Sequence, residues 1–340
     1  MNQKHRRNHI VAIQRVDGMF TTLVDEVGEV LVQCYQALLG SLKATILIDV
    51  EVALIGPCLD DNSHTILLAP VSNAVIKEVL YSSGNDKATI LMTILLFSLK
   101  KVWHMVGNDF CDVVTDFFAS RELIKQVNHS IIALIPKLAS VTFVANFHLI
   151  SWCNVIYKVI FKILAGCITN VLQSIISHVQ NAFLGERNMV DNINLLQELL
   201  WEYGRKRASP RCIIKIEFKK AFDYVQWPFF RHLFMLFGFP TRFVHLVMKC
   251  VETASFSVAV NGDLFSFFPG KCSVRQGDPL SPYLFITCME YFSRMLHLAT
   301  QQAGFCFHPK CSSLWSCHLA FADDVLLLCH GDISLVVVLF

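Results

Sequence analysis

Two adjacent carboxylates, Asp323 and Asp324, are the side chains of this sequence best suited to chemistry. They lie between two apolar runs, residues 319–322 and 325–328, and the pattern predicts two buried strands joined by a turn. Like charges at the tip of an apolar hairpin are costly unless something compensates them. A divalent cation is the natural compensation, and such oxygen ligands suit Mg²⁺. The alternative is an exposed turn in which water solvates both side chains.

A third acid, Glu217, lies at the end of another apolar run, residues 212–218, which the β-branched composition predicts to be a strand. Carboxylates on neighbouring strands are what two-metal phosphoryl transfer requires, with ions about 3.5–4 Å apart. Such ions activate a 3′-hydroxyl and stabilise the leaving pyrophosphate. An aromatic residue beneath the incoming sugar, here Phe222, could sense the 2′-hydroxyl that distinguishes RNA from DNA.

A polar loop at residues 275–282, with the sequence Arg-Gln-Gly-Asp-Pro-Leu-Ser-Pro, is the third candidate element. Gly277 allows close approach of the backbone, and Ser281 followed by Pro282 predicts a helix with Ser281 as its N-cap. The N–H groups of this helix start and the Arg275 side chain could bind a nucleotide or a template strand. The alternative is an ordinary Gly-Pro turn before a helix.

Basic residues cluster between Arg205 and Lys220, where seven of them accompany one acid, although the net charge of the chain is only +2. This cluster could follow phosphates, or it could be a solvated helix end and loop. The 13 cysteines are odd in number and scattered, which favours reduced thiols over a disulfide framework. One group lacks C-x-x-C spacing and is interpreted as structural rather than as a zinc site: Cys306, His308, Cys311, Cys317 and His318.

The composition is unusually apolar, with 54% hydrophobic and 16% charged residues and a mean hydropathy of +0.48. A membrane-spanning helix needs about 20 apolar residues. The longest apolar runs, residues 89–99 and 131–147, are bounded or interrupted by lysine or proline. We therefore expect no transmembrane segment, no signal peptide, no membrane partner and an intracellular location, either nuclear or cytoplasmic.

The elements that must position these residues follow from periodicity and from turn signals. Asn261-Gly262 predicts a tight hairpin turn, and Gly166 is expected to break a long helix. The expected class is α+β, an antiparallel sheet with flanking helices. Helices are predicted at 22–39, 74–81, 109–119, 154–179, 190–203, 228–237 and 281–298, and strands at 130–135, 212–218, 256–268, 318–322 and 325–329.

The order of these motifs resembles motifs A, B and C of reverse transcriptases, specifically the LINE-type (non-LTR) retrotransposon enzymes, in a plant-like form. The resemblance covers roughly residues 75–332. It implies a right-hand polymerase fold with fingers at about 85–204 and a palm at about 211–340. Residues 1–74 are expected to be a connector, and the endonuclease and thumb are expected to be missing, so that the fold is incomplete at its C-terminus.

The resemblance also implies roles for individual residues. The acids that bind two Mg²⁺ ions correspond to Glu217, Asp323 and Asp324. The aromatic gate corresponds to Phe222, and the contacts to nucleotide and template correspond to Arg275, Gln276 and Gly277. The implied partners are an RNA template, a DNA primer and deoxynucleoside triphosphates. The basic residues expected to meet the nucleic-acid backbone are Arg205, Lys206, Arg207 and Arg211.

This chain departs from the family pattern at positions that matter for activity. The first metal-binding acid is usually Asp, and Glu217 is one methylene longer. A fingers motif usually written R-P-I-S is His-Leu-Ile-Ser at residues 148–151, and a further fingers motif is lost after Lys87-Ala88. Two hypotheses therefore stand beside each other: an RNA-directed DNA polymerase domain, and a catalytically impaired remnant that at most binds nucleic acid. A membrane-associated protein is a third hypothesis, suggested only by the hydropathy.

Overall fold

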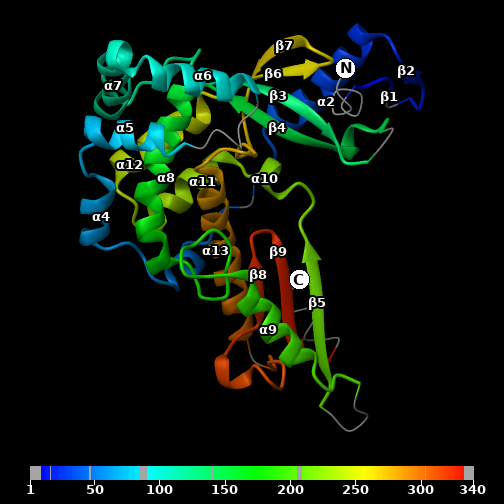
Figure 1. Cartoon of the computed structure of the whole chain (residues 1–340). Coiled ribbons are helices and arrows are strands. Elements are labelled where there is room, and N and C mark those ends of the chain that lie inside the picture. Colours follow the sequence, from blue (N-terminus) through cyan, green and yellow to red (C-terminus); the bar gives the residue numbers. More distant parts are fainter. Residues whose placement is uncertain are drawn as a thin grey trace.

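The computed structural model of the chain describes residues 9–332, apart from 16, 46, 84–89, 139–140, 205–208 and 303. The described residues form helices around a two-stranded, a three-stranded and a four-stranded sheet. In Figure 1 the three-stranded sheet lies at the lower end of the molecule and the four-stranded sheet at the upper end. This architecture agrees with the predicted α+β class.

The three-stranded sheet consists of β5 (Arg211–Glu217), β9 (Asp324–His330) and β8 (His318–Phe321), in that order and fully antiparallel. Helix α13 (Ser281–Thr300) covers one face, where Leu296 packs with Val325. Helix α9 (Met189–Leu200) covers the other face, where Leu199 packs with Leu328. The central strand β9 is apolar on both faces because helices cover both sides of the sheet.

The four-stranded sheet has the order β4-β3-β6-β7. Its strands are β3 (His129–Pro136), β4 (Phe147–Cys153), β6 (Ser255–Val260) and β7 (Asp263–Pro269). The predicted hairpin turn is confirmed, since Asn261 and Gly262 have φ values of 53° and 109°. The expected antiparallel sheet is present in β5, β9 and β8, but in this second sheet β3 and β6 pair in parallel, which was not expected. The long intervening segment allows it, since a parallel neighbour requires a crossover rather than a hairpin.

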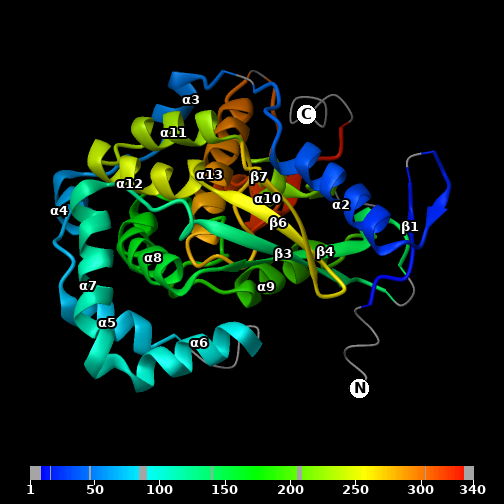
Figure 2. The same ribbon diagram turned by 90° about the horizontal axis from the view of Figure 1, so that it is seen from above.

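The remaining helices pack around these sheets, and Figure 2 shows α6 and α7 on the side of the molecule away from β1 and β2. Their bounds are α2 (Val24–Leu39), α3 (Val50–Leu54), α4 (Asp61–Leu67), α5 (Asn73–Tyr81), α6 (Ile90–Lys101), α7 (Trp103–Ser120), α8 (Val155–Ile175), α10 (Ala221–Tyr224), α11 (Trp227–Leu236) and α12 (Thr241–Glu252). The two short strands are β1 (Ile13–Gln14) and β2 (Phe20–Thr21).

Several predictions for helices need correction. Helix α7 begins at Trp103, six residues earlier than expected, and α8 ends at Ile175, four residues earlier than expected. Helix α8 is not broken at Gly166, because this glycine lies on an exposed position while apolar neighbours such as Ile163 and Ile168 are buried and hold the helix. Helix α9 ends at Leu200, three residues earlier than expected. Ser281 is the first residue of α13 rather than its N-cap, and Asp278 accepts a hydrogen bond from the Leu280 N–H just before the helix (3.0 Å).

The prediction that no segment is long and apolar enough to span a membrane is wrong for helix α8. In the described part of the chain it is the one helix that is long and apolar enough to cross a membrane by length and composition. The scan of the sequence missed it because Lys158 and Lys162 interrupt the apolar run. However, 56% of its apolar window is buried inside the fold, so the core accounts for its composition.

The segment before α5 packs against the rest of the chain. Helix α2 lies close to β7, where a side chain at Gly28 would meet the Phe265 ring. The Leu39 carbonyl accepts hydrogen bonds from the N–H groups of Lys271 (2.7 Å) and Cys272 (3.3 Å). The predicted boundary between a connector and a second region at residue 74 stays a prediction.

Candidate functional site

Strands β5 and β9 bring two of the predicted acids together. Their antiparallel register pairs Glu217 with Asp324, and directly opposite residues of such a pair project their side chains from the same face of the sheet. Both side chains are exposed. The prediction that Glu217 lies next to the Asp pair is therefore confirmed at the level of the backbone.

The turn between β8 and β9 differs by one residue from the predicted one. Phe321 pairs with Asp324, so the two loop residues are Ala322 and Asp323, and Asp324 begins the strand. Asp323 is half-buried, and Ala322 is buried with a left-handed φ of 55°. The side-chain amide of Gln180 contacts the backbone of Ala322 on both its N–H and its carbonyl.

Lys215 contacts one of the three acids, and the sequence did not predict this contact. Its Nζ lies 3.1 Å from Asp324 Oδ1. The hydrogen bond to Asp324 raises the pKa of Lys215, and the charges of Glu217 and Asp323 act in the same direction. The alternation of strand side chains was the available signal, because Lys215 and Glu217 are two residues apart and share a face. The exposed pair contributes little to stability, but it places a positive charge beside all three carboxylates.

The three acids are suited to a hard cation by chemical type and by backbone position. Carboxylates at the ends of two adjacent strands are the oxygen ligands that Mg²⁺ prefers. Within the described ranges, no three His, Cys, Asp or Glu side chains are grouped as a ready-made metal site. Glu217, Asp323 and Asp324 are the residues that could hold such an ion.

Phe222 contacts helix α13 through its ring and the segment before the Arg275 loop through its backbone. Its ring stacks on Phe285 of α13, with centroids 4.3 Å apart and an interplanar angle of 15°. Its carbonyl accepts a hydrogen bond from the Val274 N–H (3.0 Å), immediately before the loop that begins at Arg275. The ring is half-buried. The predicted aromatic gate is thus joined to the predicted nucleotide loop.

The Arg275 side chain is not at the surface, contrary to what a direct nucleotide contact requires. It is 7% exposed, and its Nη2 donates to the Asn128 carbonyl (3.2 Å) and to Asn128 Oδ1 (2.6 Å). The guanidinium lies over the rings of Tyr157, 4.6 Å from the centroid, and Phe256, 5.5 Å away. A buried guanidinium that is hydrogen-bonded and stacked in this way binds the protein itself.

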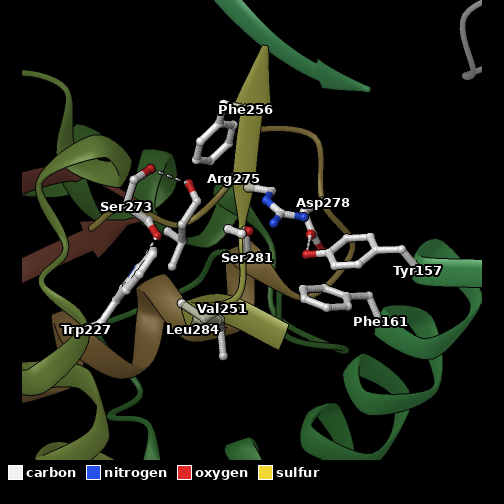
Figure 3. A pocket seen from close by; sticks show the side chains of 12 residues that line it. Tyr157, Phe161, Trp227, Val251, Phe256, Ser273, Arg275, Asp278, Ser281 and Leu284 are labelled. Atoms are coloured by element: carbon white, nitrogen blue, oxygen red, sulfur yellow. Dashed lines mark hydrogen bonds between the residues drawn. The ribbon is translucent and has the colours of Figure 1, made fainter. Parts of the chain in front are cut away.

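Asp278 completes the buried polar cluster below the loop. Figure 3 shows the Arg275 guanidinium and the Asp278 carboxylate pointing toward one another, with the Tyr157 hydroxyl donating to Asp278 Oδ2 (2.6 Å). Burial raises the pKa of Asp278 to about 6, while the Arg275 charge and the Tyr157 hydrogen bond act against this rise. The cavity here is only about 10 Å³, so there is room for one water molecule at most.

Gln276 and Gly277 are the parts of the loop that reach the surface. Gln276 is half-buried, and Gly277 is exposed with a φ of 88° and no atom within 4 Å of its Cβ position. The Gln276 carbonyl accepts a weak hydrogen bond from the Ser151 N–H of β4 (3.4 Å). Their predicted contact with nucleotide or template stays a prediction.

Of the four basic residues predicted to contact the nucleic-acid backbone, the structure describes only Arg211. Arg205, Lys206 and Arg207 lie outside the described residues, as does Lys87-Ala88. Arg211 lies at the opposite end of β5 from Glu217, about 20 Å away along the strand. Its guanidinium lies 5.0 Å from the Tyr203 ring centroid and donates to the Glu202 carbonyl.

The cysteine and histidine cluster is structural in its described contacts. Cys317 Sγ lies 3.3 Å from His318 Nδ1, and Cys311 Sγ lies 3.9 Å from His308 Nδ1. These are two separate pairs, and all four of these side chains are buried. The interpretation as ordinary structural residues stays a prediction.

Comparison with known proteins gives a family match over this whole site. A profile of the family described as reverse transcriptase (RNA-dependent DNA polymerase) matches residues 135–339. The match includes the three acids, the aromatic residue and the loop that begins at Arg275. The Transposon TX1 uncharacterized 149 kDa protein of Xenopus laevis is 24% identical over 280 residues, which cover 82% of this chain and 21% of that protein.

Two further relatives carry names of retrotransposable elements. A Pol polyprotein from the type-1 element R2 of Popillia japonica is 29% identical over 143 residues, 42% of this chain and 23% of that protein. A Pol polyprotein from the type-2 element R2DM of Drosophila melanogaster is 28% identical over 208 residues, 60% of this chain and 18% of that protein. The chain therefore spans about a fifth of the length of the curated relatives that it matches.

Proposed function

The chain belongs to the reverse transcriptase (RNA-dependent DNA polymerase) family, and on this premise we propose that it is the domain that synthesises DNA on an RNA template within a longer retrotransposon protein. The predicted resemblance to LINE-type enzymes is confirmed by the family and by its relatives, whereas the plant-like form stays a prediction. The observation that carries the proposal is the register that sets Glu217 opposite Asp324, beside Asp323.

Glu217, Asp323 and Asp324 would hold two Mg²⁺ ions. When bound, such ions activate the primer 3′-hydroxyl and stabilise the charge on the leaving pyrophosphate. The chain contributes the hairpin and the neighbouring strand, which present the carboxylates at one end of a rigid sheet. Lys215 places a positive charge beside Asp324.

The other proposed contacts concern the incoming nucleotide. Phe222, stacked on Phe285, would lie beneath the sugar and disfavour a 2′-hydroxyl by contact. Gln276 and Gly277 would meet the nucleotide or the template, because they are the parts of their loop that reach solvent. Arg275 would hold that loop in place from below.

Primer extension on an RNA template with Mg²⁺ and deoxynucleoside triphosphates tests the proposal. The variants are Glu217→Asp and Asp323→Ala, and the control is Asp25→Ala, an exposed acid on α2. We expect Asp323→Ala to abolish extension and Asp25→Ala to leave it unchanged. We expect Glu217→Asp to raise the rate, because a 1 Å misplacement of a reacting group costs on the order of 100-fold.

The combination of active and inactive variants distinguishes a competent polymerase site from an impaired remnant. If the wild type is silent and Glu217→Asp is active, the rest of the site is competent and the longer acid is the defect. If every variant is silent on a folded protein, the proposal of an active polymerase is overturned in favour of a remnant that at most binds nucleic acid.

A further inference from the structure

We propose that Gln180 is a positioning residue for the turn between β8 and β9. Its side-chain amide hydrogen-bonds to the backbone of Ala322 and thereby fixes the direction in which the Asp323 and Asp324 side chains project. The inference rests on the proposed function, since it assigns a role relative to those two acids. Gln180 lies in the connection between α8 and α9, far from the hairpin in sequence, and is 4% exposed.

The Gln180 amide forms two hydrogen bonds with Ala322, one with its N–H and one with its carbonyl. Gln180 Oε1 accepts from the Ala322 N–H (2.8 Å), and Gln180 Nε2 donates to the Ala322 carbonyl (3.2 Å). The same Oε1 also accepts from the Ala182 N–H (3.1 Å). A planar amide bonded on both its oxygen and its nitrogen has a fixed orientation, so the peptide groups around Ala322 are fixed with it.

Ala322 is a residue that needs such support. Its φ of 55° is left-handed, a conformation that non-glycine residues adopt only when the surroundings impose it. Ala322 is also buried, so water does not readily replace the amide of Gln180 if it is lost. The residue that immediately follows is Asp323, and a change in the Ala322 backbone would therefore redirect that carboxylate.

Gln180 is itself held by the chain around it. Arg187 Nη1 donates to the carbonyls of Gln180 (2.9 Å) and Ser177 (2.7 Å). The Ser177 N–H donates to Glu290 Oε2 of α13 (2.8 Å). The connection is therefore anchored at one side to α13 and reaches the catalytic turn at the other.

The chain offers a matched control on the same strand. Asn192 of α9 donates its side-chain amide to the Ala320 carbonyl of β8 (3.0 Å), two residues before Ala322. Both amides bond to the backbone of this hairpin, but only Gln180 touches the turn residue. A role in positioning predicts different consequences for the two, whereas a general contribution to strand stability predicts the same consequence.

The test compares Gln180→Met with Asn192→Leu in the full chain. Mn²⁺ binding is followed by electron paramagnetic resonance, and amide exchange at residues 319–325 is followed by mass spectrometry. We expect Gln180→Met to weaken Mn²⁺ binding about 10- to 100-fold, as loss of groups that orient metal ligands usually does. It should also speed exchange at 322–324. Asn192→Leu should leave Mn²⁺ binding within about twofold.

A second variant covers the case in which Gln180→Met does not fold. Gln180→Glu keeps an oxygen for the Ala322 N–H but offers no donor to the Ala322 carbonyl, so it should show the same two changes. Wild-type values for both measurements in a folded Gln180 variant would overturn the proposal. If the wild type binds no Mn²⁺, the proposed function fails, and unchanged exchange at 322–324 would then still refute the role of Gln180.

Discussion

At the scale of single residues, Lys215 is the clearest example of a side chain whose role depends on a neighbour. It was part of a basic cluster in the sequence, where contact with phosphates was one explanation. In the fold it faces the carboxylates of the proposed metal site and bonds to Asp324. A positive charge at this position competes with a cation for the same oxygen atoms, and this competition can be measured.

We predict that Lys215→Met binds Mn²⁺ more tightly than the wild type. The pair is exposed and screened by water, so we expect the increase in affinity to be only a few-fold. Titration followed by electron paramagnetic resonance measures the change, and Lys219→Met, an exposed lysine in the loop after β5, is the control. Equal affinities for the two variants would show that Lys215 does not compete with the ion.

Substitution of Tyr157 tests how much the buried cluster of Tyr157, Arg275 and Asp278 contributes to stability. Replacing it with phenylalanine removes the hydroxyl that donates to the Asp278 carboxylate. Hydrogen bonds to charged groups contribute about 1.5–3 kcal/mol, and we expect Tyr157→Phe to lose about that much free energy of unfolding in urea. The control is Tyr203→Phe, which removes an exposed hydroxyl that donates to the Arg211 carbonyl. An equally large loss of free energy of unfolding for Tyr203→Phe would show that burial of the Tyr157 hydrogen bond does not account for the effect.

At the scale of elements, the sequence predicted best what local patterns determine. The strand that carries Glu217, the Asn261-Gly262 turn and helix α2 were predicted from β-branched composition, turn residues and helical periodicity, respectively. The parallel pairing of β3 with β6 could not be found, because it depends on where a long connection returns the chain. The same limit applies to Gln180 and Arg275, whose contacts with Ala322 and Asn128 join segments more than 100 residues apart.

Two glycines in helices show how the surroundings decide the effect of one substitution. Gly166 of α8 has no atom within 4 Å of its Cβ position, and alanine is about 1 kcal/mol better than glycine in a helix interior. We therefore expect Gly166→Ala to stabilise the protein by about that amount. Gly28 of α2 lies against the Phe265 ring, so Gly28→Ala should cost about 1–3 kcal/mol by overpacking. Urea unfolding of both variants should give opposite signs.

At the scale of the whole molecule, the apolar composition reflects extensive burial around the two larger sheets. Helix α8 alone places Val159, Ile160, Ile168 and Leu172 in the core. The same burial extends to polar groups, and two of them titrate in opposite directions. Asp278 has a pKa raised to about 6, and His318, which hydrogen-bonds to Ser293 (2.6 Å), has a pKa lowered to about 4 by burial.

The sign of each contribution to stability follows from which state binds the proton. His318 stays neutral in the folded protein between its ordinary pKa of 6.5 and about 4, while the unfolded chain takes up a proton there. Its contribution is therefore lost as the pH falls through this window. Asp278 binds its proton in the folded state below about 6, whereas its ordinary pKa is 3.8. Its contribution is present at low pH and is lost as the pH rises through 6.

We therefore predict that substitutions at the two sites change the acid stability of the protein with opposite slopes. At 1.36 kcal/mol per pKa unit, each site contributes on the order of 3 kcal/mol, and the two largely cancel between pH 4 and 6 in the wild type. His318→Gln should gain stability relative to the wild type as the pH falls from 7 to 4.5, and Asp278→Asn should lose it. Urea unfolding at both pH values measures the differences, and slopes of the same sign would mean that other groups control acid stability.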